Sequence, residues 1–295
     1  MELMGKVVGM NTSDGLYNLI VGDKDRNNIN LKISPELAHN IKIGHTYIFK
    51  YNAHEGIERT TYTVYSFEKI TDLPLLEKDE ALRSFYPQAP LPLDAAIDEV
   101  YSYIDKIDNL VIKAITKHLV DKYKDDFFTF PAASKFHHAY VGGLAYHSLG
   151  MVHFADGFIA NYPYLNKDYI YAGVLLHDIG KTIELTGAIN TEYTLKGQLI
   201  GHLVLGAMEI EKAAIELGYE NTEEALMLEH MLISHHGQPQ FGSAKKPMTP
   251  EALVLWYIDT IDSKFRVLGE ELDKTEPKTF TDAIGVLDRT KIYKI

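Results

Sequence analysis

The spacing of apolar residues changes near residue 72 of this 295-residue chain, and this change limits the folds that the chain can adopt. From Met1 to about Thr71, apolar and polar residues alternate in short runs separated by turn-forming stretches, a pattern typical of β-strands. Beyond that point, apolar residues recur at about every third or fourth position, as on the buried face of a helix. The sequence therefore predicts an α+β multidomain protein, with a small β domain followed by an all-α bundle.

The N-terminal region contains five strand-like runs, which are GKVVGM, GLYNLIVG, NNINLKI, HTYIFKYN and RTTYTVYSFEKI. Between the third and fourth runs, Ser34 precedes a Pro-Glu pair, and a serine cap followed by proline favours the start of a short helix. Five strands with a helix in this position are typical of an OB-like β-barrel.

Aromatic residues alternate along the last two runs, with Tyr47, Phe49 and Tyr51 on the fourth and with Tyr65 and Phe67 on the fifth. Each set is expected to share one face of its strand. The side chains would either fill the barrel core or stack on nucleic-acid bases, and periodicity alone does not name the face.

Residues 72–93 contain four of the eleven prolines and are predicted to link a barrel domain at 1–71 to a helical domain at 94–295. In the helical domain the apolar periodicity predicts helices at about 94–106, 108–123, 141–161, 167–179, 196–217, 222–235 and 250–269.

The chain has no cysteine, and its formal net charge is −12. Any bound metal must therefore be held by imidazole, carboxylate and water. The acidic balance counts against a broad basic surface for nucleic acid, but divalent cations and a few local lysines could still engage a phosphodiester. No segment approaches the roughly 18 apolar residues of a membrane span, and no signal-peptide pattern is present, so a cytoplasmic protein with no membrane partner is expected.

Histidines and aspartates on the predicted helices are the candidate metal ligands. The histidines share helix faces with apolar residues, so they point into the bundle. A single histidine on such a face is usually a satisfied core residue, but several together need buried partners, which a metal centre supplies. A buried hydrogen-bonded network is the alternative. The predicted ligands are His147, His177, Asp178, His202, His235 and Asp259.

The adjacent pair His177 and Asp178 lies at a predicted helix end and can direct two kinds of ligand at one centre. A carboxylate in this position can bridge two divalent ions, and two ions about 3.5–4 Å apart suit in-line displacement at phosphorus. Nitrogen and oxygen ligands without sulfur suit Mn²⁺, Fe²⁺, Co²⁺, Ni²⁺ or Zn²⁺.

Three further residues are predicted to assist. His236 would point about 100° away from the preceding histidine and could contact substrate or another metal, or form a supporting hydrogen bond. His138 lies in a loop before the His147 helix and is predicted to face substrate. Asp262 lies one turn after Asp259 and is expected to support a metal ligand or to pair with Arg266.

Five strings of this chain resemble the YhaM-type 3′-5′ exoribonucleases, and they are PAASKFHHAYVGGLAYHSLGM, YAGVLLHDIGKTIELTG, GQLIGHLVLG, LISHHG and YIDTIDSKF. Members of this family carry an OB-fold before an HD domain, the helical domain of the HD-superfamily metal-dependent phosphohydrolases. The resemblance runs from about Phe85 to the C-terminus. It implies an HD-domain bundle in this chain.

The resemblance also implies an activity, in which nucleoside 5′-monophosphates are removed from the 3′ end of single-stranded RNA, with single-stranded DNA as another candidate substrate. It favours Mn²⁺ as the ion and places Lys181 near the phosphate. The predicted catalytic residues are Asp178, Lys181 and His236, and Lys181 and His236 are also predicted to bind substrate. The resemblance also implies two divalent ions. One would be held by His147, His177, Asp178 and Asp259, and the other by Asp178, His202 and His235.

Other functions remain open at this point. An HD-type phosphohydrolase could act on nucleotides or on cyclic dinucleotides, although GQPQFGSAKKP after the double histidine lacks the Gly-Tyr-Pro signature of the HD-GYP proteins. The same scaffold can carry a di-iron oxygenase. A non-catalytic nucleic-acid-binding module is the third alternative, and a homo-oligomer is compatible with all of them.

Overall fold

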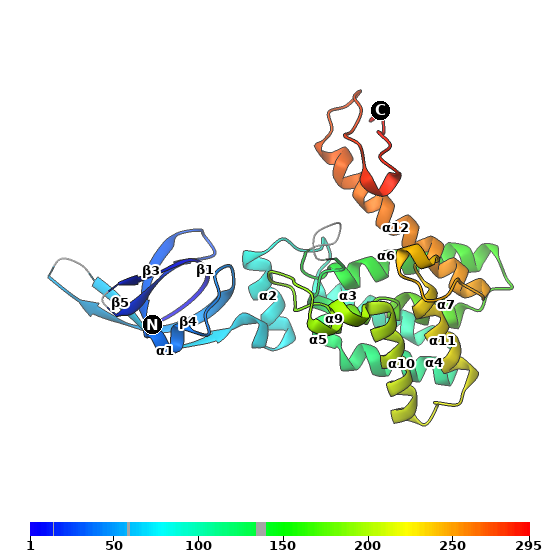
Figure 1. Ribbon diagram of the computed structural model, residues 1–295, viewed down its shortest axis with the longest axis horizontal. Coiled ribbons are helices and arrows are strands. Elements are labelled where there is room, and N and C mark those ends of the chain that lie inside the picture. Colours follow the sequence, from blue (N-terminus) through cyan, green and yellow to red (C-terminus); the bar gives the residue numbers. More distant parts are fainter. Residues whose placement is uncertain (14, 58–59, 134–139) are drawn as a thin grey trace. The chain divides into compact units, whose positions relative to one another are not determined.

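The computed structural model describes residues 1–13, 15–57, 60–133 and 140–295. The chain divides into two compact units, Met1–Gln88 and Ala89–Ile295. The first is a β-barrel and the second is helical (Figure 1), so the predicted fold class is confirmed. Among the described residues, no helix combines the length and the apolar character needed to cross a membrane.

Five strands close the barrel in the order β1-β2-β3-β5-β4. Their bounds are Glu2–Ser13 for β1, Leu16–Gly22 for β2, Asn28–Ile33 for β3, Thr46–Glu55 for β4 and Thr60–Lys69 for β5. All neighbours are antiparallel except β3 and β5, whose parallel contact closes the barrel. The short helix α1 (Pro35–Ala38) lies between β3 and β4, where the Ser34 hydroxyl accepts a hydrogen bond from the backbone of Leu37, 3.4 Å away.

Most of the barrel aromatics fill its core. Tyr47, Phe49 and Tyr51 are buried among the aliphatic side chains of the other strands, and Phe67 packs against them. Tyr65 does not share the face of Phe67, contrary to the expectation, because the β4–β5 register shifts between Lys50 and Tyr51 and leaves Tyr65 without a partner. Its side chain is 54% exposed.

The first unit continues past the barrel into α2 (Leu75–Phe85), which lies within the residues expected to form a linker. The helices of the second unit are α3 (Leu93–Asp105), α4 (Leu110–Lys122), α5 (Lys124–Thr129), α6 (Gly143–Asn161), α7 (Lys167–Leu176), α8 (Lys181–Glu184), α9 (Leu195–Ile200), α10 (His202–Leu217), α11 (Glu223–Ser234) and α12 (Pro250–Lys274). Three single-turn 3₁₀ helices also occur, and they are η1 (Ile70–Asp72), η2 (Pro239–Phe241) and η3 (Gly285–Leu287).

Helix α7 is the centre of the helical unit. It packs against α3, α4, α6, α11 and α12, and its side chains Val174, Leu175 and Leu176 are fully buried. A helix that is apolar on every side is stable only inside a bundle. The residues that follow α7 therefore emerge in the interior of the domain.

The predicted helix at 196–217 is interrupted, which corrects the expectation. Gly201 has φ +80° and separates α9 from α10. This backbone conformation is open to glycine but strained for other residues, so the helix ends there and a new one starts at His202. The interruption places His202 in the first turn of α10.

An ion-pair network around the buried Glu209 joins α10 to α4. The Glu209 carboxylate accepts hydrogen bonds from Lys122 Nζ at 3.0 Å, from the Tyr123 hydroxyl at 2.6 Å and from Lys212 Nζ at 2.5 Å. Burial alone would raise the pKa of Glu209, but these three donors together lower it to about 2 from an ordinary value of 4.5.

Replacing Glu209 with Gln should lower the free energy of unfolding at about pH 7 by about 1–3 kcal/mol, because three donors lose a charged acceptor. A lowered folded-state pKa stabilises the protein above the unfolded-state pKa, and this contribution is lost as the pH falls from about 4.5 towards about 2. Urea titrations of wild type and Glu209→Gln should thus differ more at about pH 7 than at about pH 3. The exposed Glu220→Gln variant is the control and should stay within about 0.5 kcal/mol of wild type. Equal effects of the two variants would contradict this role of Glu209.

Candidate metal centre

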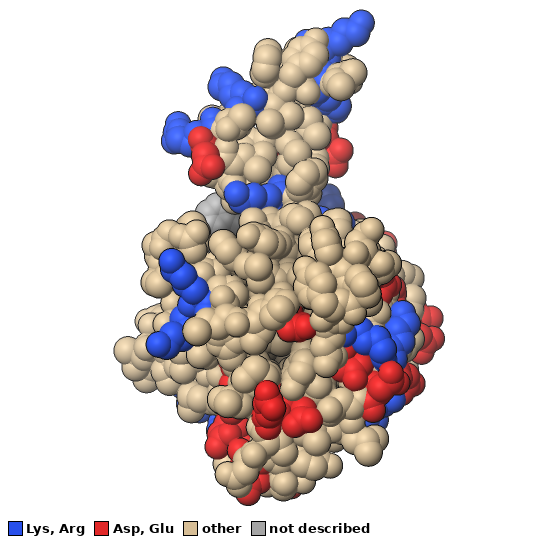
Figure 2. Space-filling view, turned by 90° about the vertical axis from the view of Figure 1, so that its right-hand side faces the viewer, with Lys and Arg blue, Asp and Glu red and all other residues tan. Residues whose placement is uncertain are grey.

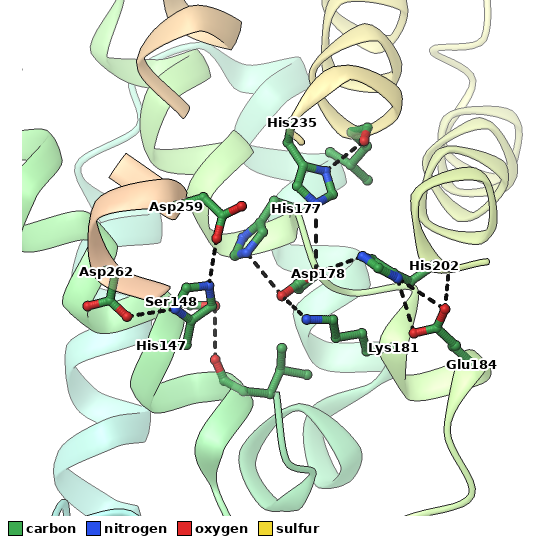
Figure 3. Close-up of polar contacts among 12 residues, drawn as sticks. His147, Ser148, His177, Asp178, Lys181, Glu184, His202, His235, Asp259 and Asp262 are labelled. Carbon is green, nitrogen blue, oxygen red and sulfur yellow. Dashed lines mark hydrogen bonds and ion pairs between the residues drawn. The ribbon is translucent and has the colours of Figure 1, made fainter. Parts of the chain in front are cut away.

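The structure brings the six predicted ligands together where five helices meet (Figure 3). Two of the ligands, His177 and Asp178, follow the last residue of α7. The others come from α6, from the start of α10, from the residue after α11 and from α12, and they are His147, His202, His235 and Asp259.

Two of the histidines have one ring nitrogen fixed by the backbone. Nδ1 of His177 lies 2.7 Å from the Val174 carbonyl, and Nδ1 of His235 lies 2.7 Å from the Leu232 carbonyl. A carbonyl can only accept, so each Nδ1 donates a proton. Nε2 is then the unprotonated nitrogen of the neutral ring, the form that ligates a metal. Burial, with His236 and His177 nearby, holds the pKa of His235 well below its ordinary value.

The Asp178 carboxylate has nitrogen atoms of four other side chains within 4 Å. Its Oδ2 is 3.1 Å from His177 Nε2 and 2.6 Å from Lys181 Nζ, and its Oδ1 is 3.4 Å from His202 Nε2 and 3.8 Å from His235 Nε2. Burial would raise the pKa of Asp178, but the charge of Lys181 holds it well below its ordinary value. The carboxylate is therefore ionised and can accept from, or bridge, several partners.

Four buried atoms at this centre make no hydrogen bond with any described residue, and they are His177 Nε2, Asp178 Oδ1, His202 Nε2 and His235 Nε2. Leaving one buried polar group unsatisfied costs about 1–3 kcal/mol. Imidazole nitrogens and a carboxylate oxygen are a donor set that divalent transition metals accept. The residues therefore fit divalent cations, which would give all four atoms a partner.

The possible ligand atoms fall into two groups. In each group, one atom per residue lies within 4.8 Å of the others. The first group is His147, His177 and Asp259, and the second is His202, His235 and His236. Asp178 contacts members of both groups, since it lies close to His177 and to His202.

Asp262 and Arg266 hold the first group in place. Asp262 Oδ2 lies 2.8 Å from His147 Nδ1, while His147 Nε2 lies 3.2 Å from Asp259 Oδ1. Burial would lower the pKa of His147, but hydrogen bonds with Asp259 and Asp262 raise it to about 9. Asp262 also lies 3.4 Å from Arg266 Nε, and Arg266 donates to the Tyr146 hydroxyl at 2.7 Å. Asp262 thus both supports the predicted ligand His147 and pairs with Arg266.

Glu184 holds the second group and was missed in the sequence. Its Oε1 accepts a hydrogen bond from the His202 backbone nitrogen at 3.0 Å and lies 3.1 Å from His202 Nδ1. The carboxylate is buried and caps the first turn of α10. The available signal was a single acidic residue between the apolar Ile183 and Leu185, six residues after Asp178. Gly180 allows α10 to come this close, because a Cβ there would lie 2.1 Å from the His202 carbonyl oxygen.

Lys181 and His236 line a pocket that opens beside the centre. Lys181 is partly buried, and its pairing with Asp178 raises its pKa although burial opposes the charge. Nδ1 of His236 lies 2.7 Å from the Phe241 carbonyl, and burial and His202 lower the pKa of His236. The predicted substrate contact His138 lies outside the described residues.

The pocket has a volume of about 650 Å³. Metal-centre residues form one side of it. The lining also includes residues of η2, of α12 and of the C-terminal segment that sequence reasoning did not select, and they are Phe241, Trp256, Tyr257, Lys264, Val286 and Asp288.

Comparison with known proteins places these residues in a family. A family model described as "HD domain" matches residues 144–264. Three relatives carry the name 3′-5′ exoribonuclease YhaM. The relative from Geobacillus sp. is 42% identical over 228 residues, which are 77% of this chain and 70% of the relative. The one from Bacillus licheniformis is 44% identical over 71% of this chain and 67% of the relative, and the one from Bacillus pumilus is 40% identical over 77% and 72%.

Replacing Glu184 with Gln should weaken the apparent affinity for Mn²⁺ by about 10- to 100-fold, because the amide no longer orients His202 as the carboxylate does. Isothermal titration of the metal-free protein with Mn²⁺ measures this affinity. Glu192→Gln is the matched control, since this carboxylate is exposed and belongs to the loop before α9. If both variants bind Mn²⁺ as wild type does, Glu184 does not support a metal ligand.

Proposed function

This chain belongs to the YhaM family of 3′-5′ exoribonucleases, and we propose that it shortens single-stranded RNA from the 3′ end. One observation carries the proposal. The buried nitrogen and oxygen atoms at and around Asp178 that have no hydrogen-bond partner among the described residues lie beside a pocket that Lys181 also lines. A structural metal site would not require such a pocket beside the centre.

The proposed ligands of two divalent cations are the six residues selected from the sequence. His147, His177, Asp178 and Asp259 would hold one ion, and Asp178, His202 and His235 would hold the other. The contacts of Asp178 with both groups support its role as the bridge. Mn²⁺ is our choice of ion, on the resemblance to the family, and the donor set suits Fe²⁺, Co²⁺, Ni²⁺ and Zn²⁺ as well.

The proposed reaction is hydrolysis of the last phosphodiester bond. The oxygen of a water molecule bonds to phosphorus, the bond from phosphorus to the 3′-oxygen of the preceding nucleotide breaks, and that oxygen takes up a proton. The products are a nucleoside 5′-monophosphate and a strand shorter by one nucleotide. Bound divalent cations would activate the water and stabilise the negative charge of the phosphate in the transition state.

Lys181 and His236 are the residues of this chain that we assign to the reacting phosphate. The ammonium of Lys181 lies in the pocket wall and is kept charged by Asp178, so it can neutralise a phosphate oxygen. His236 has one ring nitrogen fixed on the Phe241 carbonyl and lines the same pocket. Its other nitrogen can bind the second cation or exchange a proton with the departing 3′-oxygen. His138 remains a proposed substrate contact.

A denaturing-gel time course with Mn²⁺ tests the reaction. Wild type should shorten a 5′-labelled single strand stepwise and release labelled mononucleotide from a 3′-labelled one. Asp178→Asn should be slower by at least about a hundredfold, because it removes the proposed bridge. RNA that stays intact with metal bound would refute the exoribonuclease and would direct the assay to cyclic dinucleotides and to oxygen consumption.

Replacing Lys181 with Gln should lower kcat/KM for RNA by about 10²- to 10³-fold, because a preorganised positive charge at the phosphate is lost. The loss should appear mainly in kcat, and Lys181→Arg should retain part of the rate. Lys196→Gln, on the exposed surface of α9, removes the same charge elsewhere and serves as the control. A Lys181→Gln enzyme with the rate of the Lys196→Gln enzyme would exclude this role.

A further inference from the structure

The segment after α12 folds into a hairpin whose tip reaches the pocket of the candidate metal centre. The backbone of Lys278 donates to the Lys294 carbonyl at 2.8 Å, that of Thr281 to the Ile292 carbonyl at 2.9 Å and that of Ile284 to the Thr290 carbonyl at 3.2 Å. The tip contains η3, and three of its residues line the pocket, namely Gly285, Val286 and Asp288. We call residues 278–294 the C-terminal hairpin.

The open end of the hairpin is fixed far from this tip. Lys294 Nζ donates to the carbonyl of Leu272 at 2.7 Å and to that of Thr275 at 2.8 Å, so it caps the last turn of α12. Thr260, beside the tip in the pocket, and Leu272 are twelve residues apart on α12. At the helical rise this is on the order of 18 Å. The hairpin therefore leads from the pocket along the second half of α12.

The hairpin has two well-buried residues and many exposed ones. Thr281 and Ile284 are buried. Phe280 and Tyr293 pair across the two strands with ring centroids 5.1 Å apart, and they are 63% and 47% exposed. Lys278 and Lys291, each two residues before one of these rings in the sequence, are exposed as well.

The exposed cations of the hairpin have no acidic partners. Lys278, Arg289 and Lys291 form no ion pair with any described residue, and neither does Lys264, which lies in the pocket wall. The hairpin carries four basic and two acidic residues, a net charge of +2 in a chain of net charge −12. Figure 2 shows Lys and Arg side chains gathered on the protruding end of the helical unit, while Asp and Glu prevail at the opposite end.

We propose that the exposed aromatic and basic side chains of the C-terminal hairpin bind the part of a single-stranded RNA that precedes the nucleotide being cleaved. This inference rests on the proposed function. The bases would stack on Phe280 and Tyr293, and the phosphates would lie against Lys278, Arg289 and Lys291, a combination of aromatic and basic side chains that binds single strands without sequence preference. Lys264 would hold the phosphate nearest to the pocket.

The length of the hairpin sets the length of RNA that it contacts. Stacked nucleotides advance about 3.4 Å each, so roughly five of them span the distance from the pocket to the end of α12. Affinity should therefore rise with strand length up to about six nucleotides and then level off.

Two double variants of the 295-residue chain test the proposal. The lysine variant combines Lys278→Gln with Lys291→Gln, and the aromatic variant combines Phe280→Ala with Tyr293→Ala. The control is Lys113→Gln with Lys117→Gln on α4, which removes the same two charges on a helix that packs against α7, α10 and α11. Fluorescence anisotropy in an Asp178→Asn background measures binding of a dinucleotide and of a strand of about twelve nucleotides. Thermal unfolding checks that each variant folds.

Each hairpin variant should weaken binding of the long strand by about tenfold relative to the control, with a much smaller change for the dinucleotide. The lysine variant should also make the slope of log affinity against log salt concentration shallower. The change in slope should correspond to the loss of roughly one to two phosphate contacts. Binding of the long strand at control strength by the well-folded lysine variant would overturn the proposal, and so would an equal loss for both strand lengths. Because binding is measured without turnover, a failure of the proposed hydrolysis would be seen separately, as intact RNA in the wild-type time course.

Discussion

The architecture of the helical unit depends on one buried carboxylate. Asp178 follows a helix that is buried on every side, so it lies inside the domain, where an isolated charge would be strongly unfavourable. The surroundings compensate with a lysine at 2.6 Å and with imidazoles on either side. Each of these groups comes from the end or the first turn of a helix. The packing of the helices is therefore tied to the electrostatics of this centre.

Supporting carboxylates extend this arrangement outward. Asp262 orients His147 on one side, and Glu184 orients His202 on the other. Both are buried, and each is satisfied by an imidazole and a further donor, Arg266 for Asp262 and the His202 backbone for Glu184. The centre is thus preorganised by hydrogen bonds that the chain itself supplies, before any cation binds.

Much of this fold could be predicted from the sequence, because strand and helix periods and inward histidines are local patterns. Properties that arise only from tertiary contacts could not. Tyr65 lies on an unexpected face because the register of a neighbouring strand shifts beside it. Glu184 is one acidic residue among many until α10 is packed against it. The C-terminal hairpin was missed because its two short strands pair only through a few hydrogen bonds and carry no strong apolar alternation. The structure brings the six predicted ligands together, and metal binding by these residues stays a prediction.

The ligands come from residues as far apart in the sequence as His147 and Asp259, and they are carried by five separate helices. Two cations bridged by Asp178 would act as a cross-link that ties these helices together, and their binding energy would add to the stability of the helical unit. The barrel has a core of its own, to which none of the proposed ligands belongs. Chelation would accordingly loosen the helical unit, so that metal supply would govern how long this unit survives proteolysis.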